Sequence, residues 1–251
     1  MIVAPSSSPI VPEPIPFSRL VRVEWIKATD TRSARWLLGL VGLTTTALML
    51  VPVLVPTSFE QTQATYLRVA ALGLTVLLPV VTILLFTGEW SQRSIMTTFT
   101  QEPRRIRVVN AKLAVSMLMG TGGAIFGGAV AAAGLAVVAA AGRDVASDMS
   151  VGVVAGYLIF VFLNVLAAVA LGALLQNSAA AIAAAFALPA TFAVIGSAST
   201  FVADWIDMSV WSWILENDWS GHIPQISVTV IIWVAAPLSA GIARTVRRDI
   251  G

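Results

Sequence analysis

Six long apolar stretches, each free of charged residues in its middle, constrain this chain more than any other feature. A membrane-spanning helix needs about 20 consecutive, mostly apolar residues. The 251 residues are 57% hydrophobic and 11% charged, whereas a soluble domain carries about 25% charged residues. The sequence therefore predicts an all-α polytopic membrane protein. Its six expected spans are Trp36–Val55, Tyr66–Phe86, Val109–Ala141, Val151–Leu175, Ala179–Ala203 and Ile226–Ala243.

The chain is expected to consist of a short N-terminal segment and one transmembrane domain. Residues 1–16 contain five prolines, which predicts a disordered or extended N-terminal segment. Residues 17–251 form a single six-span transmembrane domain. The third span is overlong at 33 residues, and it is expected to be tilted, broken or extended beyond the membrane.

The positions of the basic residues predict how the spans are oriented. Of the 15 Lys and Arg residues, 13 fall on one side of the predicted membrane, and only Arg68 and Arg143 fall on the other. Short loops rich in Lys and Arg remain on the cytoplasmic side. Both termini and the loop between spans two and three are therefore expected in the cytoplasm. The net charge of only +2 argues against a nucleic-acid partner.

The segment Phe17–Ala28 has the pattern of an amphipathic helix lying on the membrane surface. Its apolar face and its basic face follow a helical period, so membrane lipid is an expected partner. Val23 and Ile26 fall on the polar arc, and Glu24 falls on the apolar one. The simpler alternative is a helix that only anchors the first span. The apolar face is Phe17, Leu20, Val21, Trp25 and Ala28, and the basic face is Arg19, Arg22 and Lys27.

Several kinds of chemistry are missing from the sequence. There is no cysteine, no glycine-rich loop followed by Lys and Ser or Thr, and no ionisable residue in the middle of a span. The chain is therefore expected to have no catalytic residue, no metal ligand, no bound cofactor and no energy source of its own. A serine protease dyad of Ser197 and His222 is disfavoured, because no motif surrounds the serine and His222 has a surface context.

Small residues and tryptophans mark two further features. Gly123 with Gly127, and Gly152 with Gly156, form GxxxG pairs, which favour close helix packing within one chain over a dimerisation face. Four tryptophans between Asp204 and His222 predict a segment that rests at the outer membrane interface.

The segment Gly88–Leu113 is unusually charged for its place between two apolar spans. Ile95, Met96 and Phe99 have helical spacing and would form an exposed apolar knob on a helix that ends before Pro103. Arg104, Arg105 and Arg107 then return the chain to the membrane. A plain solvated turn is the commoner reading of such a loop.

In this segment the chain resembles the permease subunits of ABC-2 type transporters. The resemblance rests on Glu89 at the end of span two, the helix Ser91–Phe99, the run Pro103-Arg104-Arg105 and Lys112 at the start of span three. The upstream segment Arg22–Trp36 is similar to the interfacial helix of that family, with Glu24, Lys27 and Arg32 at matching positions. A glycine common in the family is replaced here by Arg93-Ser94, which leaves the local helix geometry open.

The resemblance implies a membrane subunit of a bacterial plasma-membrane exporter. A coupling helix would dock on a separate ATPase subunit, which would hold ATP and Mg²⁺. The implied assembly has two permease chains, identical or paralogous, and two ATPase chains, and it exports an amphipathic or lipophilic substrate. A membrane scaffold that recruits a cytoplasmic partner is the alternative. The implied coupling residues are Glu89, Arg93, Ile95, Met96, Phe99, Arg104 and Arg105, and those of the interfacial helix are Arg22, Glu24, Trp25 and Lys27.

Overall fold

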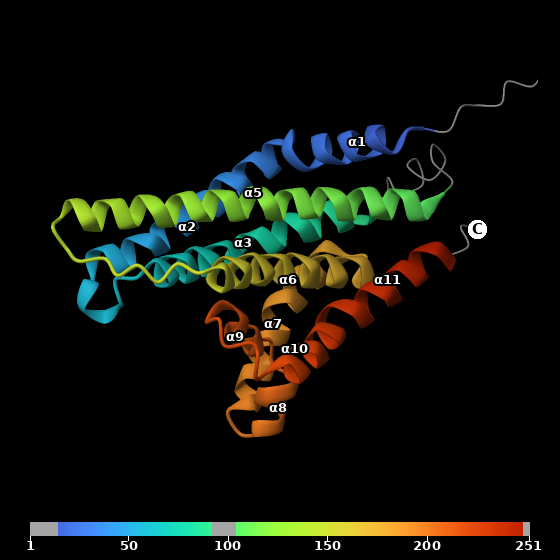
Figure 1. Ribbon diagram of the computed structural model, residues 1–251. Coiled ribbons are helices and arrows are strands. Elements are labelled where there is room, and N and C mark those ends of the chain that lie inside the picture. The colour runs from blue at the N-terminus through green and yellow to red at the C-terminus, as the bar shows by residue number, and fades with distance from the viewer. Residues whose placement is uncertain (1–14, 92–103, 248–251) are drawn as a thin grey trace, which may run out of the picture.

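A computed structural model of the chain describes residues 15–91 and 104–247. Within these ranges the fold is entirely helical, without a named strand (Figure 1). Six helices are long and apolar enough to cross a membrane. They are α2 (Arg32–Leu54), α3 (Gln63–Ser91), α5 (Arg105–Ala140), α6 (Val151–Leu175), α7 (Ser178–Gly196) and the combined segment α10 (Ile223–Val230), η3 (Ile231–Ala235) and α11 (Ala236–Arg247).

The predicted spans are confirmed, with differences at their ends. The fourth expected span coincides with α6, and the third is one unbroken helix of 36 residues, so neither a break nor a kink divides it. The fifth ends earlier than predicted, at Gly196, and a separate short helix α8 (Thr200–Trp205) follows. Ser199 and the backbone bonds around it turn the chain there, which apolar composition alone does not reveal.

The amphipathic helix forms where it was expected, as α1 (Phe17–Thr29). The orientation of α1 explains why Glu24 falls on the apolar arc and why Val23 and Ile26 fall on the polar arc. Glu24 and Ala28 are buried, whereas Trp25, Val23 and Ile26 are exposed. The helix therefore turns Glu24 and Ala28 toward the bundle and leaves Trp25 exposed.

Helix α3 lies at the centre of the bundle and packs against α2, α5 and α6. Its buried face carries Tyr66, Leu74 and Ile83, all almost inaccessible to solvent. Figure 1 shows α2, α3 and α5 running alongside one another over most of their length, while α7 leaves them at a steep angle. Because α3 is covered on several sides, it is the most buried of the six apolar helices.

Both GxxxG pairs are used for packing within the chain, as favoured from the sequence. A Cβ atom added to Gly127 would collide with the Tyr157 hydroxyl, which donates a hydrogen bond to the Ala124 carbonyl at 2.7 Å. A Cβ atom added to Gly156 would meet the backbone carbonyl of Ile214. Neither position can accept a larger side chain without movement of its neighbour.

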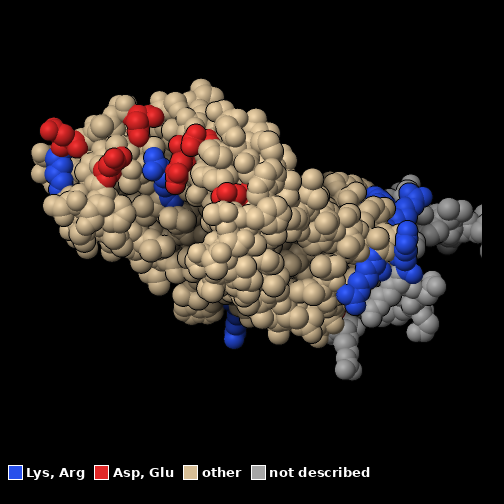
Figure 2. Space-filling view, turned by 90° about the horizontal axis from the view of Figure 1, so that it is seen from below, with Lys and Arg blue, Asp and Glu red and all other residues tan. Residues whose placement is uncertain are grey.

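Charges of opposite sign gather at opposite ends of the bundle. Acidic side chains cluster toward one end of the face in Figure 2, and a group of Lys and Arg side chains lies at the other end. The acidic end is well ordered by hydrogen bonds. Asp148 accepts from the Ala64 amide at the start of α3, and Arg143 donates to the Val53 carbonyl at the end of α2. The loop before α6 is thereby fixed to two other helices.

The segment after α7 is folded against the sixth span rather than resting only at a surface. It contains α8, η2 (Met208–Trp211) and α9 (Ser212–Leu215). Trp211 is fully buried and donates its indole N–H to the Thr229 hydroxyl at 3.0 Å. The prediction of an interfacial tryptophan is therefore wrong for Trp211, which is a core residue. The side chains of Trp205, Trp213 and Trp219 are only partly buried.

Candidate functional site

Four charged side chains from three helices form a closed ring of ion pairs at the basic end of the bundle. The Lys112 ammonium donates to Glu24 Oε2 at 2.8 Å and lies 3.1 Å from Glu89 Oε2. The Lys27 ammonium donates to Glu24 Oε1 at 2.8 Å and to Glu89 Oε1 at 2.6 Å. Each carboxylate therefore bridges both ammonium groups, and the four formal charges cancel.

Local sequence explains why these side chains meet. Glu24 and Lys27 are three residues apart on α1, so they project from neighbouring positions on one face. Glu89 lies in the last turn of α3 and Lys112 lies near the start of α5. Because α1 packs against both α3 and α5, its inward face brings Glu24 to Lys112 and Lys27 to Glu89.

The ring is unevenly exposed to solvent. The side chains of Lys112 and Glu24 are 5% and 4% exposed, whereas that of Lys27 is 40% exposed. Lys112 also donates to the Leu85 carbonyl at 3.1 Å, so its charge has two hydrogen bonds and lies between two carboxylates. A buried ion pair is tolerated only when such partners offset its desolvation. Lys112 and Glu24 are therefore the pair whose disruption would cost most.

The outer lysine of the ring has a raised pKa. Burial by itself lowers the pKa of Lys27, but hydrogen bonds to Glu24 and Glu89 and the charges of these carboxylates outweigh it. The pKa of the Lys27 ammonium consequently lies above its ordinary value of 10.5. Lys27 stays charged throughout the neutral range, so the ring remains closed there.

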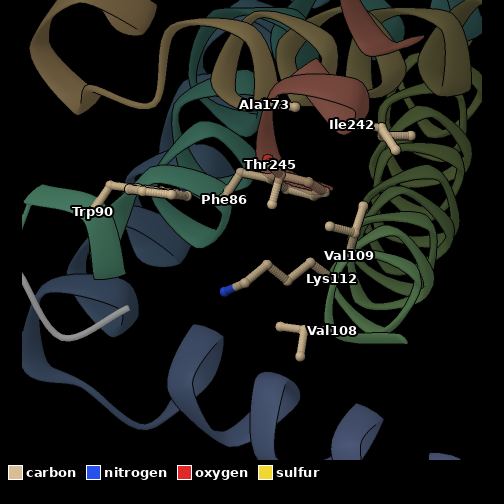
Figure 3. A pocket seen from close by; sticks show the side chains of 8 residues that line it. All are labelled: Phe86, Trp90, Val108, Val109, Lys112, Ala173, Ile242 and Thr245. Atoms are coloured by element: carbon tan, nitrogen blue, oxygen red, sulfur yellow. The ribbon is translucent and has the colours of Figure 1, made fainter. Parts of the chain in front are cut away.

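A small cavity lies next to Lys112, as Figure 3 shows. Its volume is about 20 Å³, which is enough for one water molecule. Phe86 and Ile242 close it on the apolar side, and the side chain of Lys112 runs along its edge toward α1. The space is too small for a substrate or a cofactor, so the ring is a structural brace and not a binding pocket.

Hydrogen bonds join the end of α11 to the same region. The Arg105 guanidinium donates to the Thr245 carbonyl at 3.1 Å, and Gln176 donates to the Thr245 hydroxyl at 3.0 Å. Arg244 donates to the Leu174 carbonyl at 2.8 Å. The last helix is therefore tied to the start of α5 and to the turn between α6 and α7.

A chain of hydroxyl groups connects the end of α3 to the start of α7. Ser178 Oγ lies 2.7 Å from Thr87 Oγ1 and 2.8 Å from Ser91 Oγ. With the ring and the bonds around Thr245, this chain draws α1, α3, α5, α7 and α11 together at one end of the bundle. That end is where α3 ends and α5 begins, on either side of residues 92–103.

The structure brings together only some of the residues predicted for coupling. Glu89 joins the ring with Glu24, Lys27 and Lys112, and the predicted pairing of Glu89 with Arg93 falls outside the described residues. Arg105 contacts α11, Arg104 stands immediately before α5, and Arg22 is exposed on α1. Arg93, Ile95, Met96 and Phe99 lie outside the described residues, so the predicted apolar knob is untested.

Gln176 and Thr245 were missed as members of this polar end. Gln176 follows α6 in a left-handed conformation, with φ of 53°. One weak feature of the sequence could have pointed to Gln176, namely that it belongs to a lone Gln-Asn pair between two apolar spans. Thr245 offers none, because its hydroxyl also bonds to the Gly241 carbonyl as an ordinary helical threonine does.

In the described part of the chain, no group of three or more His, Cys, Asp or Glu side chains is placed to hold a metal ion. Comparison with known protein families, with curated proteins and with solved structures gives no match for this chain. The ring of Glu24, Lys27, Glu89 and Lys112 is the best-defined polar site outside the apolar body of the bundle.

Proposed function

We propose that this chain is the membrane-spanning permease subunit of an ATP-binding cassette exporter of the ABC-2 type. A separate ATPase subunit would supply the work, because the sequence has no nucleotide-binding loop. The cargo would be an amphipathic or lipophilic molecule, in keeping with spans that carry no charge in their middle. Two permease chains and two ATPase chains would form the complete exporter in a bacterial plasma membrane, with both termini in the cytoplasm.

The observation that carries this proposal is the ring itself. Glu89 lies two residues before α3 ends at Ser91, and Lys112 lies seven residues after α5 begins at Arg105. Residues 92–103 are therefore flanked by two helices that the ring joins to each other and to α1. A partner that binds residues 92–103 would therefore act on several helices at once, and not on one helix end alone.

The proposed cytoplasmic side is the end where the ring lies. The basic residues gathered there satisfy the rule that orients membrane proteins. Helix α1 presents Trp25, Val23 and Ile26 outward beside exposed Arg19 and Arg22, a combination suited to anionic lipid headgroups. This arrangement supports an interfacial position for α1.

Reconstitution with a candidate ATPase subunit, sought among the neighbouring genes, tests the proposal. Purified permease and ATPase are placed in inside-out vesicles, and uptake of a lipophilic probe is followed with ATP and with a non-hydrolysable analogue. Export predicts uptake that requires hydrolysis and both proteins. If the ATPase binds the permease but hydrolysis never moves a substrate, the scaffold alternative is the correct one.

A further inference from the structure

A large cavity lies apart from the ring, between α3, α6, α7 and the segment that follows α8. Its volume is about 490 Å³, and small-molecule sites in proteins commonly measure about 300–1,000 Å³. Phe160, Phe186 and Trp233 form much of its apolar wall, together with several alanines of α6 and α7. The space matches a molecule with a sizeable apolar body.

One carboxylate is built into the wall of this cavity. Asp207 is only 5% exposed, and its Oδ1 accepts a hydrogen bond from the Ser209 amide at 3.0 Å. Within the described residues, Asp207 forms no ion pair, and no Lys, Arg or His lines the cavity. A negative charge in such surroundings is costly unless a cation or several donors accompany it. The wall therefore lacks the positive group that would complement Asp207.

Two prolines add hydrogen-bond acceptors to the same wall. Pro79 and Pro189 have no N–H, so the carbonyls of Thr75 and Ala185, four residues earlier, lose their usual helical donor. All four of these residues line the cavity. The side-chain amide of Asn164 donates a hydrogen bond to the Phe160 carbonyl at 2.9 Å. The residues that line the cavity thus include two with carbonyls that lack a helical donor, and one carboxylate.

The wall that carries Asp207 is fixed before any ligand binds. Trp233 donates its indole N–H to the Ile206 carbonyl at 2.7 Å, and its ring meets Phe192 edge to face at 5.6 Å. Trp233 lies in η3, a π-helical interruption of the sixth span, and such interruptions are frequent at functional sites. Because Ile206 directly precedes Asp207, this bond sets the position of the carboxylate. A preformed site loses less entropy on binding.

We propose that this cavity binds an amphipathic cation, with a protonated amine at Asp207 and an apolar body against α6 and α7. Charge complementarity selects the cation, because the only charged lining residue is acidic. The apolar wall selects a hydrophobic body. That such a molecule is the exported cargo rests on the proposed function, whereas its binding to the permease alone does not.

The test uses three dansyl probes that differ only in their terminal group: dansylcadaverine with an amine, its alcohol analogue and its carboxylic acid analogue. Each is titrated at neutral pH into the purified full-length permease, without ATPase, in nanodiscs of zwitterionic lipid. Energy transfer from tryptophan to dansyl reports binding. We expect the amine to bind at least about tenfold more tightly than the acid.

Three variants locate the binding. Asp207→Asn keeps an oxygen for the Ser209 amide but removes the charge, so amine binding should weaken about tenfold while alcohol binding is unchanged. Ala190→Trp fills the cavity and should weaken binding of all three probes. Asp218→Asn, which removes an exposed acid from the same outer segment, should bind the probes like the wild type.

Equal affinity of the wild type for the three probes would overturn the proposal, whether or not the Asp207 variant folds. Amine binding that persists in folded Ala190→Trp would also overturn it, because the probe would then lie elsewhere. Neither result bears on ATP-dependent export. Conversely, selective amine binding without ATP-dependent export of the amine or of any lipophilic probe would retain this site and refute the proposed function.

Discussion

The ammonium of Lys112 lies 2.8 Å from a carboxylate oxygen of Glu24, and the two residues are 88 positions apart in the sequence. This contact fastens an N-terminal helix that does not cross the bundle to a helix that does. Both side chains are almost completely buried, so neither charge has water as an alternative partner. The contact therefore ties the position of α1 to that of α5.

Lys112→Met should destabilise the protein strongly, because it removes the buried cation between Glu24 and Glu89 and leaves Lys27, which is 40% exposed, as the only cation of the ring. Breaking a buried pair in this way costs about 3–5 kcal/mol. Thermal unfolding of the purified protein in detergent measures the effect. Lys27→Met is the matched control, since Lys27 is 40% exposed and its pairs are screened by solvent, so its cost should be about 1 kcal/mol or less. Equal losses in both variants would contradict the uneven burial of the ring.

The raised pKa of Lys27 predicts how the ring responds to alkaline pH. A basic group whose pKa is higher in the folded protein stabilises the fold fully below the unfolded pKa, and that stabilisation is lost as the pH rises through the folded pKa. The stability difference between the wild type and Lys27→Gln should thus be constant at neutral pH and shrink only above about 10.5. A difference that disappears near neutral pH would show that Lys27 does not pair with Glu24 and Glu89.

Gly156→Val should destabilise the contact between α6 and the α9 segment. The added side chain meets the Ile214 backbone carbonyl, which cannot rotate away as a flexible side chain does. Overpacking of this kind costs about 1–3 kcal/mol, measurable as a lower thermal midpoint. Gly128→Val is the control, because a Cβ atom at Gly128 enters open space. A normal midpoint for Gly156→Val would mean that the two segments are not in contact.

Cysteine labelling tests the proposed orientation, because the chain has no native cysteine. Ser18 is exposed on α1, and Ser147 is exposed in the loop before α6. In intact cells, a membrane-impermeant maleimide should label Ser147→Cys and spare Ser18→Cys. Permeabilised cells provide the control, since both sites should then react. Labelling of Ser18→Cys in intact cells would reverse the orientation.

Phe99→Asp tests the coupling knob predicted between α3 and α5. A carboxylate forced into an apolar cleft of the ATPase would lose several kcal/mol in desolvation, on the order of the penalty for any unpaired buried charge. Substrate-stimulated ATP hydrolysis should fall while membrane insertion stays normal. Thr97→Asp adds the same charge at a position that helical spacing places on the opposite face. Wild-type hydrolysis by Phe99→Asp would identify the segment as a plain solvated loop.

The sequence was sufficient to predict the six apolar helices and the helix α1, because apolar length and helical period are local properties. Partners of individual charges were harder to predict. Glu24 stood out as an acid on an apolar face, which signals a buried pair, but its partner Lys112 depends on how α1 packs against α5. Glu89 was expected to pair locally with Arg93, which lies outside the described residues, and its contact with Lys27, 62 residues away, was not predicted.

The cavity lined by Asp207 was likewise not predictable from the sequence. Asp207 resembled any other acid of the outer segment in the sequence, and Trp211 resembled an interfacial anchor. The fold buries both because η2 packs against the sixth span. No local pattern predicts this packing, since it depends on the early end of α7 at Gly196 and the turn into α8.

The length of helix α5 determines how far its two ends move when the helix tilts. Its 36 residues contain no proline, and at 1.5 Å per residue such a helix is a rod about 54 Å long. A tilt of only about 5° at the end held by Lys112 would therefore displace the opposite end by about 5 Å, by the geometry of a lever of this length. The loop that joins α5 to α6 hydrogen-bonds to the start of α3 and the end of α2. A small change in the tilt of α5 at the basic end would therefore move this loop, and with it the start of α3 and the end of α2, at the acidic end.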